Sequence, residues 1–299
     1  MIDRQLWWRA ARVLAMIGVT VAVVLSVRAV NWPRTLEALR AAHGAWLLAA
    51  VAWNAVILVL WAQFWRVLRP QGEPPVSHRR MLEIVATTSA LMNTLPFGGG
   101  QASALVLLVR RAAMTKRGAL SLMALDQLGE GLVKIGLFLL VALLVPLPTW
   151  MRVGVATACA GVAVWFVIVM IASRWAAELG IVRDVNRALG ALACVAGMKG
   201  VQLVAIIAVQ HAFGLDLPAS GSLLVLATIV LASMVTVSPG NLGAFEAAVF
   251  LAYRYLEQPP ELALSLAIMQ HVCFMLPSVG IGYVIFSVQT LSRRAIASP

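Results

Sequence analysis

Long apolar stretches alternate with short polar segments along the chain. A transmembrane α-helix needs about 20 consecutive apolar residues. Stretches of about that length cover residues 13–30, 45–65, 118–148, 153–172, 188–214 and 261–289. A helix pairs its own backbone groups, as the hydrocarbon core of a bilayer requires. The pattern therefore predicts an all-α, polytopic helical membrane protein with about six full spans.

Two further apolar stretches are each interrupted by a helix-breaking segment. Residues 81–109 contain Pro96-Phe97-Gly98-Gly99-Gly100, and residues 221–256 contain Pro239-Gly240-Asn241-Leu242-Gly243. The pieces flanking the first break are too short for two comfortable spans. The pattern favours broken or re-entrant helical hairpins over pairs of tilted full spans. Unpaired peptide groups at such breaks must line a cavity enclosed by protein, which indicates a carrier.

The two halves of the chain show the same order of elements. Residues 1–148 and 149–299 each contain two spans, a broken stretch and a long span, and Ala119-Leu120-Ser121-Leu122 is echoed by Ala263-Leu264-Ser265-Leu266. Because an odd number of spans separates equivalent points, the second half should be upside down relative to the first. This order predicts two membrane domains that form an inverted repeat, as in many secondary transporters.

Composition agrees with a membrane protein and excludes a soluble globule. Hydrophobic residues make up 62% of the chain and charged residues 12%, with a formal net charge of +11. No solvated basic domain lies outside the spans, so we expect no nucleic-acid binding. Most Lys and Arg residues fall on one side if both termini are cytoplasmic, as the positive-inside rule requires. Trp residues near span ends, including Trp46, Trp61 and Trp65, are expected to anchor at the membrane interfaces.

Each glycine-rich break precedes a short apolar helix. A helix N-terminus presents unpaired N–H groups and about half a positive charge, and therefore binds anions such as phosphate. In an inverted repeat the two starts approach mid-membrane from opposite faces, which predicts a shared site for a lipid headgroup. The alternative is that the glycines permit close helix packing. The residues assigned to this site are Asn93, Gly98, Gly99, Gly100, Gln101, Lys199, Gly240, Asn241, Gly243 and Glu246.

Several charged residues lie inside predicted spans. Glu246 could cap the preceding amides, accept a proton or select a cationic group on a substrate. Lys199 is interpreted as a phosphate ligand, with a structural ion pair to Glu246 or Glu130 as the alternative. Asp126, Glu130 and Lys134 share one helix face, where Glu130 and Lys134 can form a buried ion pair or take part in ion coupling. Asp126 could instead lie at the cytoplasmic interface.

Motifs typical of enzymes are absent from the sequence. There is no Walker Gly-Lys-Ser/Thr loop, no His-Glu-x-x-His pair and no Gly-x-Ser-x-Gly elbow. We expect neither catalytic residues, nor a cofactor, nor a metal site.

The run from Pro239 to Glu246 resembles the Pro-Gly-Gly-x-Gly-x-x-Glu signature of the lysylphosphatidylglycerol synthase transmembrane family, the flippase-like domain. Asn93-Thr94-Leu95-Pro96 with the following glycines is similar to the family's first break. Two departures are visible. Gly100-Gln101-Ala102-Ser103-Ala104 stands where members often carry Gly-Glu-x-x-Arg, and Asn241 replaces a usual glycine.

The resemblance implies transbilayer movement of a phospholipid or another phosphate-bearing lipid. It does not imply lipid synthesis, because aminoacyl transfer in that family resides in a soluble C-terminal domain and this chain stops at Pro299. We expect a location in the bacterial inner membrane and a membrane lipid as the main partner, with a homo-oligomer or a lipid-modifying enzyme as further partners. The alternatives are a proton- or ion-coupled carrier of a small soluble anion and an accessory subunit of a lipid-modifying enzyme.

Overall fold

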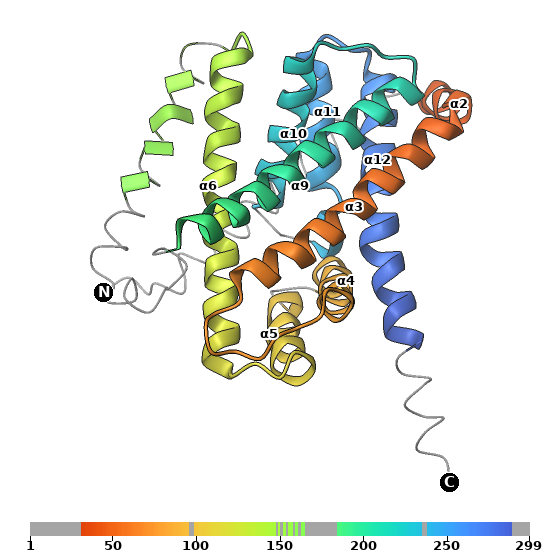
Figure 1. Ribbon diagram of the computed structural model, residues 1–299. Helices are drawn as coiled ribbons and strands as arrows, with labels where there is room; N and C mark the ends of the chain where they lie inside the picture. Colours follow the sequence, from red (N-terminus) through yellow and green to blue (C-terminus); the bar gives the residue numbers. More distant parts are fainter. Residues whose placement is uncertain are drawn as a thin grey trace, which may run out of the picture.

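The computed structural model describes residues 31–95, 99–147, 184–234 and 238–288, with scattered residues between 149 and 164 (Figure 1). Helices dominate this part of the chain, and no strand occurs among the described residues. The prediction of an all-α, polytopic membrane protein is confirmed.

Four long apolar helices form the frame of the bundle. They are α3 (Gly44–Leu68), α6 (Lys116–Leu144), α9 (Val185–Ala212) and the continuous segment Pro260–Val288. Each of the four contains 25 to 29 residues. At 1.5 Å per residue such helices are about 40 Å long, enough to cross a bilayer. They confirm four of the predicted spans. The predicted spans 13–30 and, for the most part, 153–172 lie outside the described residues.

The last long helix changes its winding midway. It begins as α12 (Pro260–Met275), passes through a π-helical turn, η3 (Leu276–Ile281), and then continues as α-helix. Pro277 lies in this turn and has no N–H to donate to the preceding turn. The wider π-helical turn accommodates the missing hydrogen bond, and the helix continues.

Both interrupted stretches form hairpins of short helices. The first consists of α4 (His78–Thr94) and α5 (Gly99–Arg111), with 17 and 13 residues. The second consists of α10 (Ala219–Ser233), the 3-10 turn η2 (Pro239–Asn241) and α11 (Ala244–Tyr255), with 15 residues in α10 and 12 in α11. Helices of these lengths measure about 18–26 Å, less than the hydrocarbon thickness of about 30 Å. Broken helices are therefore confirmed at both positions.

The two hairpins lie in opposite halves of the bundle, α4 and α5 in the lower part of Figure 1 and α10 and α11 in the upper part. Helices α3 and α9 cross between them and pack closely together. Each hairpin belongs to its own hydrophobic core: Met81, Leu108 and Leu122 represent the core around α4 and α5, and Val225 and Leu266 represent the core around α10 and α11. The inverted repeat of residues 1–148 and 149–299 stays a prediction.

Hydrogen bonds connect several helix ends that carry basic residues, and these ends lie on one face of the molecule. Arg187 at the start of α9 donates to the carbonyl oxygens of Val67 and Arg69 at 2.8 and 2.7 Å. Glu73, in the loop after α3, accepts from the backbone N–H of Thr115, the N-cap of α6, at 2.9 Å. The ends of α3 and α5 and the starts of α6 and α9 therefore share a face, as the charge pattern required.

The short helix α2 (Trp32–Ala41) was not expected from the apolar pattern. Asn31 caps it by accepting from the N–H of Arg34 at 3.4 Å, and Pro33 lies in its first turn, where a missing N–H costs nothing. The Ser265 hydroxyl of α12 donates to the Thr35 carbonyl at 3.2 Å. This bond fixes α2 against the start of the last long helix.

Candidate functional site

The two broken segments touch each other. Gly240 has a backbone φ of +60°, and a Cβ at this position would lie 3.2 Å from the Asn93 carbonyl oxygen and 2.6 Å from the Met275 Cε. A side chain would be strained there, because the conformation is left-handed and the Asn93 carbonyl and the Met275 side chain would have to move. The close approach of Asn93 and Gly240 joins the tip of the first hairpin to the turn of the second. We call this contact the seam.

Asn241 closes the second hairpin. Its φ is +57°, and its side-chain N–H donates to the Ala232 carbonyl near the end of α10 at 2.9 Å. Asparagine tolerates the left-handed region better than other non-glycine residues. This tolerance explains how Asn241 can replace the glycine that other members of the resembled family carry. The residue predicted to bind substrate is thus also a structural link between α10 and η2.

Glu246 caps α11. Its Oε2 accepts from the backbone N–H of Gly243, which has a φ of +87°, at 2.7 Å. The carboxylate therefore occupies the N-terminal end of α11, where the positive end of the helix dipole favours an anion. Of the roles proposed from the sequence, the capping role is the one that the contacts show directly.

His271 connects Glu246 to the seam. Its Nδ1 lies 2.7 Å from Glu246 Oε1, its Nε2 lies 2.9 Å from the Gly240 carbonyl oxygen, and Phe245 stacks on its ring at 4.2 Å. A carbonyl oxygen only accepts, so Nε2 carries a hydrogen, and the bond to Glu246 requires a second proton on Nδ1 or on the carboxyl group. One proton therefore lies between Nδ1 and Oε1, in a contact where His271 is buried and Glu246 is partly exposed.

Sequence spacing does not pair these two residues, because His271 lies 25 residues after Glu246. The available signal was its place beside Gln270 in an apolar span, where a titratable side chain must have a partner. Sequence spacing alone could not identify that partner.

The first break is held by local bonds and close packing. Asn93 donates to the Ser89 carbonyl at 2.9 Å, and the Thr94 hydroxyl lies 2.9 Å from the Tyr283 hydroxyl. A Cβ on Gly100 would lie 2.4 Å from the Met92 Cα. Gly100 therefore serves close helix packing, the alternative considered for these glycines.

The other residues predicted at the first break have different surroundings. Gly99 would place a Cβ 3.1 Å from the Leu95 Cβ, a tight contact with the preceding helix. Gln101 is exposed. Gly98 lies outside the described residues.

Lys199 pairs with Glu130 and not with the glycine-rich breaks. The Glu130 Oε2 lies 3.2 Å from Lys199 Nζ and 3.4 Å from Lys134 Nζ. The predicted Glu130–Lys134 pair is therefore present, and Lys199 joins it from α9. Two ammonium groups share one carboxylate, which leaves an excess charge of +1. We call Glu130, Lys134 and Lys199 the cationic cluster.

The cationic cluster lies near the middle of both long helices. Glu130 is close to the centre of α6 (Lys116–Leu144), and Lys199 is close to the centre of α9 (Val185–Ala212). The three side chains retain 18 to 22% of their exposure. A cation inside a bilayer is costly and marks a functional position unless it is fully paired.

Asp126 forms hydrogen bonds to tryptophans of α3, and no ion pair joins it to the lysines of the cationic cluster among the described residues. Its Oδ1 accepts from the indole N–H groups of Trp65 at 2.7 Å and Trp61 at 3.2 Å, and its Oδ2 accepts from Gln127 at 3.0 Å. Asp126 is buried within the bundle, and its location at the cytoplasmic interface stays a prediction. Trp65 is also buried, so it is a structural donor from α3 and not an interface anchor, whereas Trp46 is exposed as expected.

Long apolar helices, two short broken hairpins that meet at a seam and a charged cluster at mid-helix define a polytopic helical membrane protein. The family comparison agrees. Residues 12–282 match the family described as Lysylphosphatidylglycerol synthase TM region, and the chain belongs to that family. Comparison with curated proteins gives no significant match. Family membership relates the protein to lipid handling.

Proposed function

We propose that this protein moves an anionic, phosphate-bearing lipid across the bacterial inner membrane. One observation carries the proposal: the cationic cluster has an excess charge of +1 at mid-helix and remains partly exposed. An excess positive charge inside a membrane protein attracts an anion, and a phosphodiester is the anion that a membrane supplies. The protein would act as a transporter and not as an enzyme.

The attraction between this charge and a lipid phosphate is strong enough to affect the binding affinity. Two unit charges 4 Å apart interact by about 4 kcal/mol at an effective dielectric constant of about 20. Desolvation of the phosphate offsets part of this energy. A net gain of about 1.4 kcal/mol would still change affinity tenfold. The cluster is therefore suited to select anionic over zwitterionic headgroups.

The seam supports the same function. Gly240 and Asn93 meet where two hairpins from opposite halves of the bundle end, and such discontinuous helices form the moving parts and binding sites of many transporters. We propose that the hairpins separate and rejoin at the seam during transport. The acyl chains would remain in the lipid phase while the headgroup passes between the helices.

A charge series in reconstituted vesicles tests the proposal. Lys199→Gln and Lys134→Gln each reduce the cluster's charge to zero, and we expect either change to slow the translocation of fluorescently labelled phosphatidylglycerol about tenfold or more. Labelled phosphatidylcholine should be affected less, because its headgroup carries no net charge. The measurement is quenching of outer-leaflet label by dithionite, with protein density matched among vesicle samples.

The control is Lys116→Gln, an exposed lysine at the start of the same helix α6. It removes the same charge outside the cluster and should leave translocation unchanged. Glu130→Gln, which raises the cluster's charge, should increase the binding of phosphatidylglycerol. Wild-type translocation in both Lys199→Gln and Lys134→Gln would refute a role of the cluster in lipid transport.

The same vesicles separate this proposal from a carrier of small soluble anions. A soluble-anion carrier would accumulate radiolabelled inorganic phosphate, and an accessory subunit would move neither phosphate nor lipid. We expect lipid movement without phosphate uptake.

A further inference from the structure

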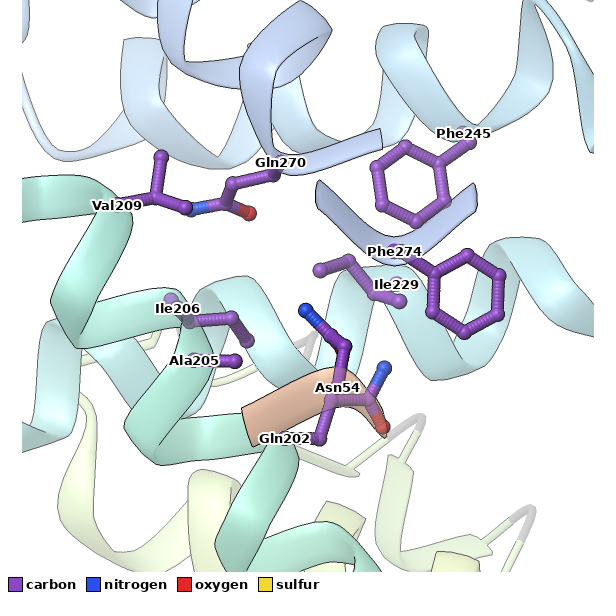
Figure 2. A pocket seen from close by; sticks show the side chains of 9 residues that line it. All are labelled: Asn54, Gln202, Ala205, Ile206, Val209, Ile229, Phe245, Gln270 and Phe274. Carbon is purple, nitrogen blue, oxygen red and sulfur yellow. The ribbon is translucent and has the colours of Figure 1, made fainter. Parts of the chain in front are cut away.

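A small cavity lies where α3, α9, α10, α11 and α12 meet (Figure 2). Its volume is about 10 Å³, close to what a single water-sized group requires. Most of its lining is apolar, and three side chains carry carboxamide groups. The lining residues are Asn54, Gln202, Ala205, Ile206, Val209, Ile229, Phe245, Gln270 and Phe274.

Gln270 presents an unsatisfied polar atom to this cavity. The residue is only 4% exposed, and its Oε1 is buried without a hydrogen-bond partner among the described residues. Figure 2 shows this oxygen directed into the cavity. A buried carbonyl without a partner costs the full desolvation of the group, so such atoms in native proteins normally bind a ligand or a water molecule.

The other end of the Gln270 amide is held by a buried polar chain. The Gln270 Nε2 donates to the Tyr253 hydroxyl, which also accepts from Gln210 Nε2 at 3.1 Å. The Ser222 hydroxyl donates to Gln210 Oε1 at 2.7 Å. If the Gln270 amide were rotated by half a turn, an N–H group would face the cavity instead of the oxygen. In either orientation one polar end of Gln270 lacks a partner.

The ligand that fits this cavity is a hydroxyl group. A hydroxyl can donate to a carboxamide oxygen and accept from a carboxamide N–H, so it satisfies either orientation. None of the described lining residues is charged, and Phe245 and Phe274 flank the space, which disfavours an ion. The small volume excludes a larger group.

We propose that Asn54, Gln202 and Gln270 form a hydroxyl-binding subsite, filled by a water molecule or by a hydroxyl of the lipid headgroup. This inference rests on the lipid transport proposed above. Gln202 lies one turn after Lys199 on α9, a spacing that places two side chains on the same side of a helix. A headgroup with its phosphate at Lys199 could therefore place a hydroxyl in the cavity. The subsite would select phospholipids whose headgroup bears free hydroxyls.

Competition between two phosphodiester lipids tests the subsite. Phosphatidylglycerol and phosphatidylethanol carry the same charge, but only phosphatidylglycerol has free headgroup hydroxyls. Native mass spectrometry of the full-length protein with both lipids should show that the wild type prefers phosphatidylglycerol by about three- to tenfold. Gln202→Met keeps the side-chain length and removes the carboxamide. This carboxamide makes no hydrogen bond among the described residues, so its removal should not disturb the fold. Without the carboxamide, the preference for phosphatidylglycerol should be abolished. Val204→Ala changes an exposed apolar side chain of the same helix outside the cavity and should keep the preference.

Each outcome has a defined meaning. A preference lost in Gln202→Met and kept in Val204→Ala assigns the hydroxyl to the lipid. An equal affinity for both lipids, with an ordered water bonded to Gln270 in an experimental structure, assigns it to water. Equal affinity with no bound hydroxyl in the cavity overturns the subsite. The lipid-transport proposal fails separately, if neither lipid is translocated or if translocation does not depend on Lys199.

Discussion

At the scale of single residues, His271 is the side chain with the clearest structural task. It bonds to the Gly240 carbonyl and to Glu246, and so connects α12 to the turn and to the cap of α11. We expect His271→Leu to destabilise the protein by about 3–5 kcal/mol, because it leaves a partly buried carboxylate without its partner. The measurement is the thermal unfolding midpoint in detergent, followed by circular dichroism.

Glu246→Gln is the matched variant. A glutamine keeps the acceptor for the Gly243 N–H and can donate to a neutral His271, so the loss should be smaller, about 1 kcal/mol. Equal destabilisation by the two variants would show that the charge of Glu246, and not its hydrogen bonds, holds the seam.

The candidate site was predictable in part at this scale. The motif identified Gly240, Asn241 and Glu246 because helix breakers and a carboxylate are conspicuous in an apolar run. It could not show that Glu246 binds His271, or that Lys199 binds Glu130 and not the breaks, because each contact joins helices whose relative rotation is set by packing.

At the scale of elements, the glycines of the helices fall into two classes that a substitution can separate. A Cβ at Gly100 would collide with the Met92 backbone in the neighbouring helix, whereas a Cβ at Gly136 in α6 would meet nothing within 4 Å. We expect Gly100→Ala to destabilise by about 1–3 kcal/mol through overpacking. Gly136→Ala should be neutral or stabilising by up to about 1 kcal/mol, since alanine favours the helix.

Thermal unfolding of both variants under identical conditions checks the expectation. If Gly100→Ala matched Gly136→Ala, the hairpin of α4 and α5 would have to be looser than the structure shows. If Gly100→Ala alone also slowed translocation, tight closure of that hairpin would matter for transport as well as for stability.

Elements were the best predicted part of the structure. Spans and breaks follow from the length of apolar runs and from Pro and Gly positions, which act locally. The π-turn Leu276–Ile281 escaped prediction, since a proline can end, bend or only locally rewind a helix, and neighbouring helices decide among these outcomes.

At the scale of the whole molecule, the distribution of basic residues predicts one orientation in the membrane. Lys116 begins α6 on the face that carries Arg69 and Arg187. Arg254 lies on the opposite face, because the hydroxyl of its neighbour Tyr255 donates to the Pro146 carbonyl, beyond the far end of α6, at 3.1 Å. The positive-inside rule places the first face in the cytoplasm.

Cysteine labelling tests this orientation. A membrane-impermeant maleimide should label Arg254→Cys in intact spheroplasts and Lys116→Cys only after lysis, with the wild type and its free Cys159, Cys194 and Cys273 as background. Both positions are exposed, so a difference in labelling reports the side of the membrane and not burial. The reverse pattern would invert the protein in the membrane. The basic face would then lie outside, and the charge distribution would need an origin other than the insertion rule.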